Sequence, residues 1–161
     1  MKLGMNPWTV YGWELPESIG DHLIKELAKI GCQGLELVLD EGKNTAEILI
    51  TDKNKLTDSL QSNNMEVTSV ATALFWQYNL ASQNADVRQK GLKVVRDGCE
   101  IAQAYDVPVF LVVAGLQEAN VEYERTYETA VITLQEAGKI AADLGGIIGV
   151  ENVPSSFLMS P

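Results

Sequence analysis

The sequence predicts an α/β fold built from repeated strand and helix units. Short runs rich in β-branched residues recur along the chain, and segments with helical periodicity separate them. Alternation of this kind is typical of a parallel sheet with right-handed crossovers. Of the 161 residues, 46% are hydrophobic, which is enough to fill one sizeable core. Residues 1–161 are therefore interpreted as a single domain.

Five short runs rich in β-branched residues, which end in polar or glycine-rich turns, are interpreted as strands. They span residues 3–5, 34–39, 66–72, 107–114 and 147–151. Their starts lie about 32 to 41 residues apart along the chain. This spacing is close to that of one unit in a (β/α)8 barrel of about 250 residues.

The segment 16–30 is predicted to form the first helix. Leu23, Leu27 and Ile30 fall on one face of it and are expected to point inward. Gly31 follows, at the place where a helix end commonly needs a positive φ. A shorter helix is predicted over residues 56–63, before the third strand.

Two longer helices carry apolar stripes that are expected to face the sheet. The earlier helix can begin at any of three polar residues, Ser82, Asn84 or Asp86. Its stripe consists of Leu92, Val95, Cys99 and Ala102. The stripe of the later helix consists of Tyr127, Val131, Leu134, Ala137, Ala141 and Leu144. Gly145 and Gly146 are predicted to end this helix.

An open, doubly wound sheet is the alternative arrangement for such a pattern. Neither GxGxxG nor GxxxxGK[ST] follows the first strand, so the usual phosphate-binding loop of open sheets is missing. The spacing instead favours a partial (β/α)8 TIM barrel with about four βα units plus a fifth strand. Ser160 and Pro161 resemble the N-cap and first residue of another helix, so the chain is expected to end before the barrel is complete.

Composition and charge exclude several classes of function. There are 12 Lys and Arg against 22 Asp and Glu, a net charge of -10, which disfavours nucleic acid and anionic membranes as partners. No apolar run of about 18 residues and no signal-peptide core occurs, so a cytoplasmic location is expected. Cys32 and Cys99 are expected to be buried thiols. His22 is the single histidine and is expected on the surface, which argues against a Ser-His-Asp catalyst.

The ends of the predicted strands carry carboxylates, amides and aromatic rings. The candidate site residues are Asn6, Trp8, Glu36, Trp76, Glu151 and Asn152. Aromatic faces pack on C–H surfaces while carboxylates and amides bind hydroxyls, a lining suited to a small polyol. Glu151 ends an apolar run, a costly position unless the carboxylate is paired or binds a metal. Glu36 and Asp40 are the other candidate metal ligands, and a salt bridge or simple rim packing is the alternative for these residues.

Three segments carry a resemblance to a known family: GCQGLELVLDEG at 31–42, FWQYNLASQNADVRQKGLKVVRDGCEIAQAYDVPVFLVVAG at 75–115, and GVENVPSSFLMSP at 149–161. With them the chain resembles the N-terminal part of xylose isomerase-like TIM barrels, which include hexulose-6-phosphate isomerase-like and tagatose 3-epimerase-like proteins. The resemblance implies that Glu151 is both catalytic and a ligand of a divalent metal, Mn²⁺, Mg²⁺, Co²⁺ or Zn²⁺. The remaining ligands would come from strands six to eight of the family, which this sequence lacks. It also implies that Glu36 and Trp76 contact substrate and that Asn152 supports the metal-bound oxygens.

The resemblance leads us to expect a metal-dependent isomerase or epimerase of sugars or sugar phosphates, acting by proton transfer beside a carbonyl. With one of the expected ligands, this chain is expected to be inactive or nearly so alone. A non-catalytic half-barrel that forms a homodimer through its open edges is one alternative. A dehydratase or other lyase on the same scaffold is another. A related branch that cleaves DNA at abasic sites is disfavoured by the single histidine and the negative charge.

Overall fold

A five-stranded parallel sheet forms the centre of the computed structural model, which describes residues 3–15, 17–154 and 157–158. The strands are β1 (Gly4–Met5), β2 (Gly34–Leu39), β3 (Glu66–Thr72), β4 (Val109–Val113) and β5 (Ile147–Glu151). They are hydrogen-bonded in the order β1-β2-β3-β4-β5, the same order as in the chain. In a doubly wound sheet the order of the strands reverses at a switch point, and no such reversal occurs in this sheet. The observed order therefore confirms the partial barrel and excludes the open, doubly wound sheet.

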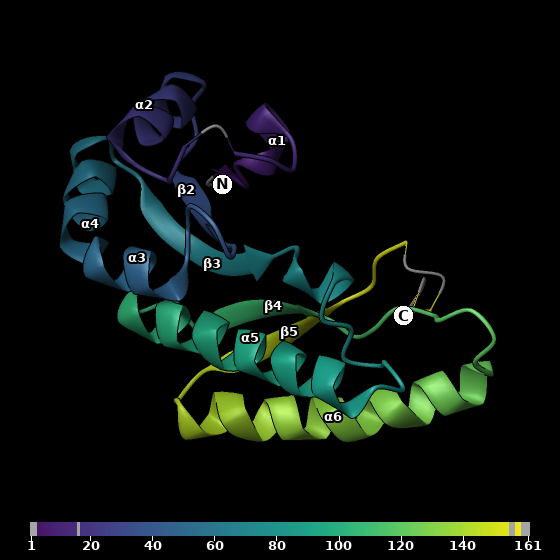
Figure 1. The fold of residues 1–161 in the computed structure, drawn as a ribbon. Helices are drawn as coiled ribbons and strands as arrows, with labels where there is room; N and C mark the ends of the chain where they lie inside the picture. Colours follow the sequence, from purple (N-terminus) through teal and green to yellow (C-terminus); the bar gives the residue numbers. More distant parts are fainter. Residues whose placement is uncertain (1–2, 16, 155–156, 159–161) are drawn as a thin grey trace.

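The helices follow one another along one side of this sheet (Figure 1). They are α2 (Asp21–Lys29), α3 (Ala46–Thr51), α4 (Lys53–Ser62), α5 (Ala85–Ala104) and α6 (Tyr123–Asp143). Two short elements follow strand ends, namely α1 (Trp8–Tyr11) after β1 and the 3-10 helix η1 (Leu74–Trp76) after β3. None of the helices in the described residues is long and apolar enough to cross a membrane.

The main core lies between the helices and the side of the sheet that faces them. On the strands, Leu35, Leu37, Val70, Phe110 and Val112 are fully buried. The helices contribute buried apolar residues to the same cluster, including Ile24, Leu27, Leu49, Leu60, Leu92, Val95 and Cys99. Continuous apolar strands such as β4 are expected where a parallel sheet is covered, and burying such side chains supplies most of the driving force for folding.

The same helix end recurs at each of the four connections from a helix to the next strand. A residue with positive φ follows each helix: Gly31 (91°), Asn64 (55°), Asp106 (57°) and Gly145 (71°). The next N–H donates to a carbonyl in the last turn, from Cys32 to Leu27, Met65 to Leu60, Val107 to Ala102 and Gly146 to Ala141, at 2.8–3.1 Å. This is the Schellman motif, which satisfies carbonyls that the helix leaves without partners.

The first helix is shorter than predicted. It begins at Asp21 and not near residue 16, because Gly20 before it has an extended backbone with φ of -158°. The N–H of Ile19 donates to Oδ1 of the buried Asn44 at 2.8 Å, which holds the preceding segment in a loop. Leu23 and Leu27 are buried as predicted, whereas Ile30 is 57% exposed at the C-cap.

The apolar stripe predicted for α6 is wrong at its N-terminal half. Tyr127 and Val131 are 52% and 37% exposed. The buried face instead consists of small residues, Thr126, Ala130, Thr133, Ala137 and Ala141. Small side chains let α6 approach its neighbours closely, and hydropathy alone does not weigh that advantage. The stripe predicted for α5 is confirmed, and Asn84 is its N-cap, accepting from the Asp86 N–H at 2.9 Å.

Other expectations concern short elements and the C-terminus. Helices α1 and α3 and the 3-10 helix were not predicted, because each has fewer than seven residues and carries little periodicity. The helix expected over residues 56–63 spans Lys53–Ser62. Ser160 and Pro161 lie outside the described residues.

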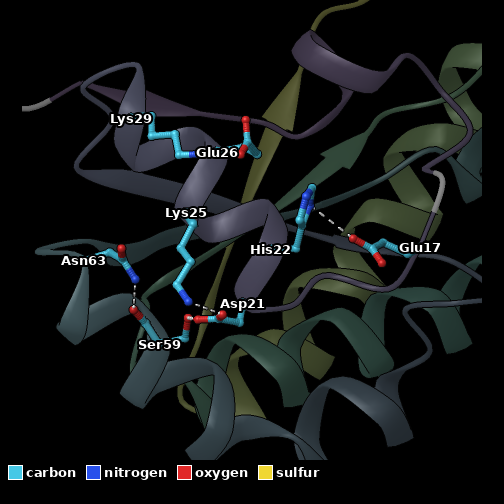
Figure 2. A network of polar contacts seen from close by, with 8 residues as sticks. All are labelled: Glu17, Asp21, His22, Lys25, Glu26, Lys29, Ser59 and Asn63. Carbon is cyan, nitrogen blue, oxygen red and sulfur yellow. Dashed lines mark hydrogen bonds and ion pairs between the residues drawn. The ribbon is translucent and has the colours of Figure 1, made fainter.

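Polar side chains join α2 to α4 on the molecular surface (Figure 2). The Ser59 hydroxyl donates to Asp21 Oδ1 at 2.7 Å, and Lys25 pairs with Asp21 Oδ2 at 2.6 Å. Hydrogen bonds from Lys25 and Ser59 lower the pKa of Asp21. The His22 side chain is 72% exposed and lies 3.4 Å from Glu17, which confirms its surface position. Cys32 and Cys99 are buried free thiols, also as predicted.

Candidate active site

A cleft of about 380 Å³ opens where the strands end on the side of the sheet away from the main core. Five of the six predicted site residues line it: Asn6, Trp8, Glu36, Trp76 and Glu151. Asn152 is exposed and is not among the lining residues. The volume falls within the range of small-molecule sites. The residues predicted from the sequence thus lie together in one cleft, while their roles remain predictions.

The topology explains why residues far apart in the chain meet here. Carboxyl ends of parallel strands lie at one edge of a sheet, and the loops after them converge there. Asn6 follows β1, Glu36 lies within β2, Trp76 ends the 3-10 helix after β3, and Glu151 is the last residue of β5. The fourth strand adds Leu111 and Val113, which make part of the lining apolar.

Glu36 is held by two neutral donors from the neighbouring strands. The Asn6 side-chain amide donates to Oε1 at 2.7 Å, and the Ser69 hydroxyl donates to Oε2 at 2.6 Å. The carboxylate is half-buried, so these bonds offset part of its desolvation. Ser69 was not predicted as a residue of the site. It reaches Glu36 because the pairing of β2 with β3 skips Thr68, a bulge for which the sequence gives no clear signal.

All three tryptophans of the chain line the cleft. The rings of Trp8 and Trp13 are 5.0 Å apart between centroids and tilted by 45°. Trp13 is 70% exposed and Trp76 is 46% exposed. Large aromatic surfaces left open at the edge of a cleft are typical of ligand contacts and of interfaces, and less so of a monomer's packed core.

The charge of the cleft is negative. Among the described lining residues the titratable groups are Glu36 and Glu151. Glu151 is exposed at the end of β5, where Val113 of β4 is its partner in the register. Carboxylates only accept hydrogen bonds when ionised, so the cleft suits groups that donate them or that carry positive charge.

The third carboxylate considered as a metal ligand, Asp40, lies elsewhere. Its Oδ1 accepts from the N–H groups of Gly42 (2.7 Å) and Asn44 (2.9 Å), and its Oδ2 accepts from the Asn44 amide (2.9 Å). Although burial works in the opposite direction, these donors keep the pKa of Asp40 below its ordinary value. Asp40 therefore stabilises its own loop, and its expected place beside Glu36 and Glu151 is wrong.

The described residues do not form a metal centre by themselves. No group of three or more His, Cys, Asp or Glu side chains in that part of the chain is arranged to hold a metal ion. Protein metal sites usually need three or four such ligands. Glu151 has the donor chemistry for one ligand of a hard divalent ion, and the described residues place no further set of ligands around it.

A second cleft of about 650 Å³ lies among α3, the 3-10 helix and α5. The Tyr78 hydroxyl donates to Glu41 at 2.7 Å on its wall, and this bond is the main cause of the raised pKa of Tyr78. Lys90 lies 5.8 Å from the centre of the Tyr78 ring. Of the predicted residues this cleft contains Asp40 alone, whose carboxylate stabilises its own loop, so we place the candidate site in the smaller cleft.

Comparisons with known proteins agree with this fold. A family model described as xylose isomerase-like TIM barrel matches residues 24–160. The structure of D-psicose 3-epimerase with D-tagatose from Clostridium cellulolyticum H10 is similar, with a TM-score of 0.70 and 20% identity. A D-tagatose 3-epimerase-like protein gives 0.70 and 27%, and 3-keto-D-glucoside 4-epimerase from E. coli gives 0.70 and 13%. A search of curated protein sequences finds no significant match.

These matches cover nearly all of this chain but about half of each solved chain. They cover 95%, 96% and 96% of this chain, but 53%, 54% and 57% of the respective solved chains. The chain therefore spans about half the length of the solved structures that it resembles.

Proposed function

The chain belongs to the xylose isomerase-like TIM barrel family, and on this premise we propose that its cleft is the sugar-binding face of an isomerase or epimerase. The observation that carries the proposal is the meeting of Glu36, Glu151 and three tryptophans in one cleft at the strand ends. Aromatic faces would pack on the C–H surface of a sugar, and the carboxylates would accept hydrogen bonds from its hydroxyls.

Glu151 is the proposed proton-transfer residue. It ends β5 at the edge of the cleft, and its exposed carboxylate can reach a ligand bound there. A positioned carboxylate that removes a proton beside a carbonyl performs general base catalysis. A dehydratase or another lyase would use the same first step, so this alternative shares the proposed site.

A divalent metal is part of the proposal for the complete site. Glu151 would supply one ligand, and the other ligands would have to come from outside the described residues. When bound, such an ion would polarise the oxygens of the substrate. The chain alone is expected to bind Mn²⁺ weakly and to show little or no turnover of ketoses.

The experiment that tests the cleft is an NMR titration with D-tagatose. The indole N–H signals of Trp8, Trp13 and Trp76 are expected to shift, while signals around Tyr78 and Lys90 stay unchanged. The variant Glu36→Gln, which keeps the size of the side chain, should weaken binding, and Tyr78→Phe should leave it unaltered. Shifts confined to the second cleft, or none at all, would contradict the proposal.

A second candidate is a non-catalytic half-barrel that associates with a second copy of itself. Exposed apolar side chains at one edge of the molecule favour it, with Ile147 59%, Val150 48% and Ile132 67% exposed on β5 and α6. Strand edges and apolar patches of this kind promote association.

A further inference from the structure

A continuous network of hydrogen bonds at the candidate site connects β3 and β2 to the segment that follows β1. It runs from the Ser69 hydroxyl on β3 to Glu36 on β2 (2.6 Å) and from Glu36 to the Asn6 amide after β1 (2.7 Å). Asn6 Oδ1 then accepts the backbone N–H of Trp8 at 2.9 Å. These hydrogen bonds thus connect the Glu36 carboxylate in the cleft to Trp8, the first residue of α1, whose ring lines the cleft.

We propose that Ser69 and Asn6 are positioning residues, which fix the Glu36 carboxylate and the Trp8 segment as one unit. The proposal rests on the sugar-binding role proposed for the cleft and adds the residues that prepare it. Asn6 acts here through Glu36 and Trp8, because both polar atoms of its side chain already bond to them. Its predicted role as a direct sugar contact becomes secondary.

The chemistry of the two donors matters as much as their position. Each oxygen of Glu36 accepts one hydrogen bond from a neutral group, and a carboxylate oxygen can accept about two. Neutral donors orient the group without cancelling its charge, as a lysine or arginine would. Glu36 therefore keeps acceptor capacity for the hydroxyls of a ligand.

The backbone of β2 and β3 is shaped to make this contact. Leu35 pairs with Val67 and Glu36 with Ser69, so Thr68 is the extra residue of a bulge. A Cβ at Gly34 would lie 2.6 Å from Thr68 Cγ2 and 3.2 Å from Gly4 Cα. Glycine at position 34 therefore leaves the room that the bulge needs, and the bulge brings Ser69 to Glu36.

Two substitutions, Asn6→Asp and Ser69→Ala, each remove one of the two hydrogen bonds donated to Glu36. In Asn6→Asp the carboxylate can still accept the Trp8 N–H, but it cannot donate to Glu36 and places a like charge beside it. Ser69→Ala removes the other donor, and Ser69→Thr keeps the hydroxyl. Asn6→Ala removes both bonds of Asn6 and serves as the control for the Trp8 segment.

The test measures D-tagatose binding by tryptophan fluorescence, since all three tryptophans line the cleft. At pH 7 we expect Asn6→Asp and Ser69→Ala to bind about tenfold more weakly, as for a lost hydrogen bond to a charged group. Ser69→Thr should retain the wild-type affinity. At pH 5, Asn6→Asp should regain affinity, because one proton shared by the two carboxyl groups restores a donor. The wild type is measured at both pH values because Glu151 also lines the cleft.

Wild-type affinity in both Asn6→Asp and Ser69→Ala would overturn the positioning role. If the wild type binds no D-tagatose, the sugar-binding proposal fails, and ligand-free measurements decide the positioning role separately. Asn6→Ala should then speed hydrogen exchange of the Trp8 amide and change the near-ultraviolet circular dichroism of the Trp8 and Trp13 pair, whereas Asn6→Asp should leave both close to wild type. An unchanged Asn6→Ala variant would overturn the role.

Discussion

Glu36 and Glu151 carry the same functional group in different surroundings. Glu36 is half-buried and fixed by donors from Ser69 on β3 and from Asn6, which follows β1. Glu151 is exposed at the end of β5, where it can approach a ligand in the cleft. We therefore expect Glu36 to act in ligand recognition and Glu151 in proton transfer.

The buried thiol of Cys99 supplies a prediction about pH. Burial raises its pKa to about 11, whereas a thiol in an unfolded chain titrates near ~8.5. Between these values the folded protein keeps a proton that the unfolded chain loses, so the free energy of unfolding falls as pH rises. Urea unfolding at pH 8, 9.5 and 10.5 should show this decrease, with a smaller slope in Cys99→Ala.

The same burial should protect the thiols from reagents. Thiolate is the reactive form, and both cysteines are nearly inaccessible, Cys32 at 3% and Cys99 at 2%. Rapid reaction with a thiol reagent at pH 8 without denaturant would contradict the buried placement.

At the scale of elements, glycine positions in the two long helices have opposite consequences. A Cβ at Gly98 of α5 would lie within 2.6 Å of three ring atoms of the buried Phe110, whereas nothing lies within 4 Å of one at Gly138 of α6. Gly98→Ala should lower the free energy of unfolding by about 1–3 kcal/mol through overpacking. Gly138→Ala should raise it by up to about 1 kcal/mol through better helix propensity. Thermal and urea unfolding measure both, and equal effects would contradict this packing of α5 on β4.

The four Schellman ends give a second prediction at this scale. Asp106 adopts a positive φ of 57°, which costs an L-residue about 1 kcal/mol relative to glycine. Asp106→Gly should therefore stabilise the protein by roughly that amount, and Gly145→Ala, at φ of 71°, should destabilise it comparably. Urea unfolding of the two variants is the measurement, and a destabilised Asp106→Gly would show that the Asp106 side chain makes a contact worth more than the strain.

Elements with strong patterns could be predicted from the sequence, and those set by tertiary contacts could not. Strands β2, β3 and β5 have the predicted bounds, since runs rich in apolar or β-branched residues mark them in the sequence. The buried face of α6 was missed because packing, and not hydropathy, selects its small residues. In the site, Glu151 was identified by its position at a strand end and Glu36 as a carboxylate within an apolar strand, but Ser69 depends on a bulge that appears only when two strands pair.

At the scale of the whole molecule, helix α6 exposes several large apolar side chains to solvent. Tyr123, Tyr127, Val131 and Ile132 lie exposed on α6. We expect the chain to associate at micromolar to millimolar concentration, and light scattering across a dilution series measures it. Ile132→Lys should weaken association, and Lys139→Glu on the same helix is the charge control. A strict monomer at high concentration would remove the half-barrel dimer from consideration.

The sequential order of the strands also bears on how the chain reaches this state. In the described part of the chain every strand pairs with its sequence neighbours, so each closing loop is of moderate length. A chain emerging from the ribosome can add one unit after another without waiting for distant segments. Opening of the folded sheet should begin at the edge strand with the shortest ladder, β1, whose register with β2 consists of Gly4 and Met5 in the described residues. Because Asn6 and Trp8 follow directly, the cleft would lose its aromatic wall long before the sheet itself came apart.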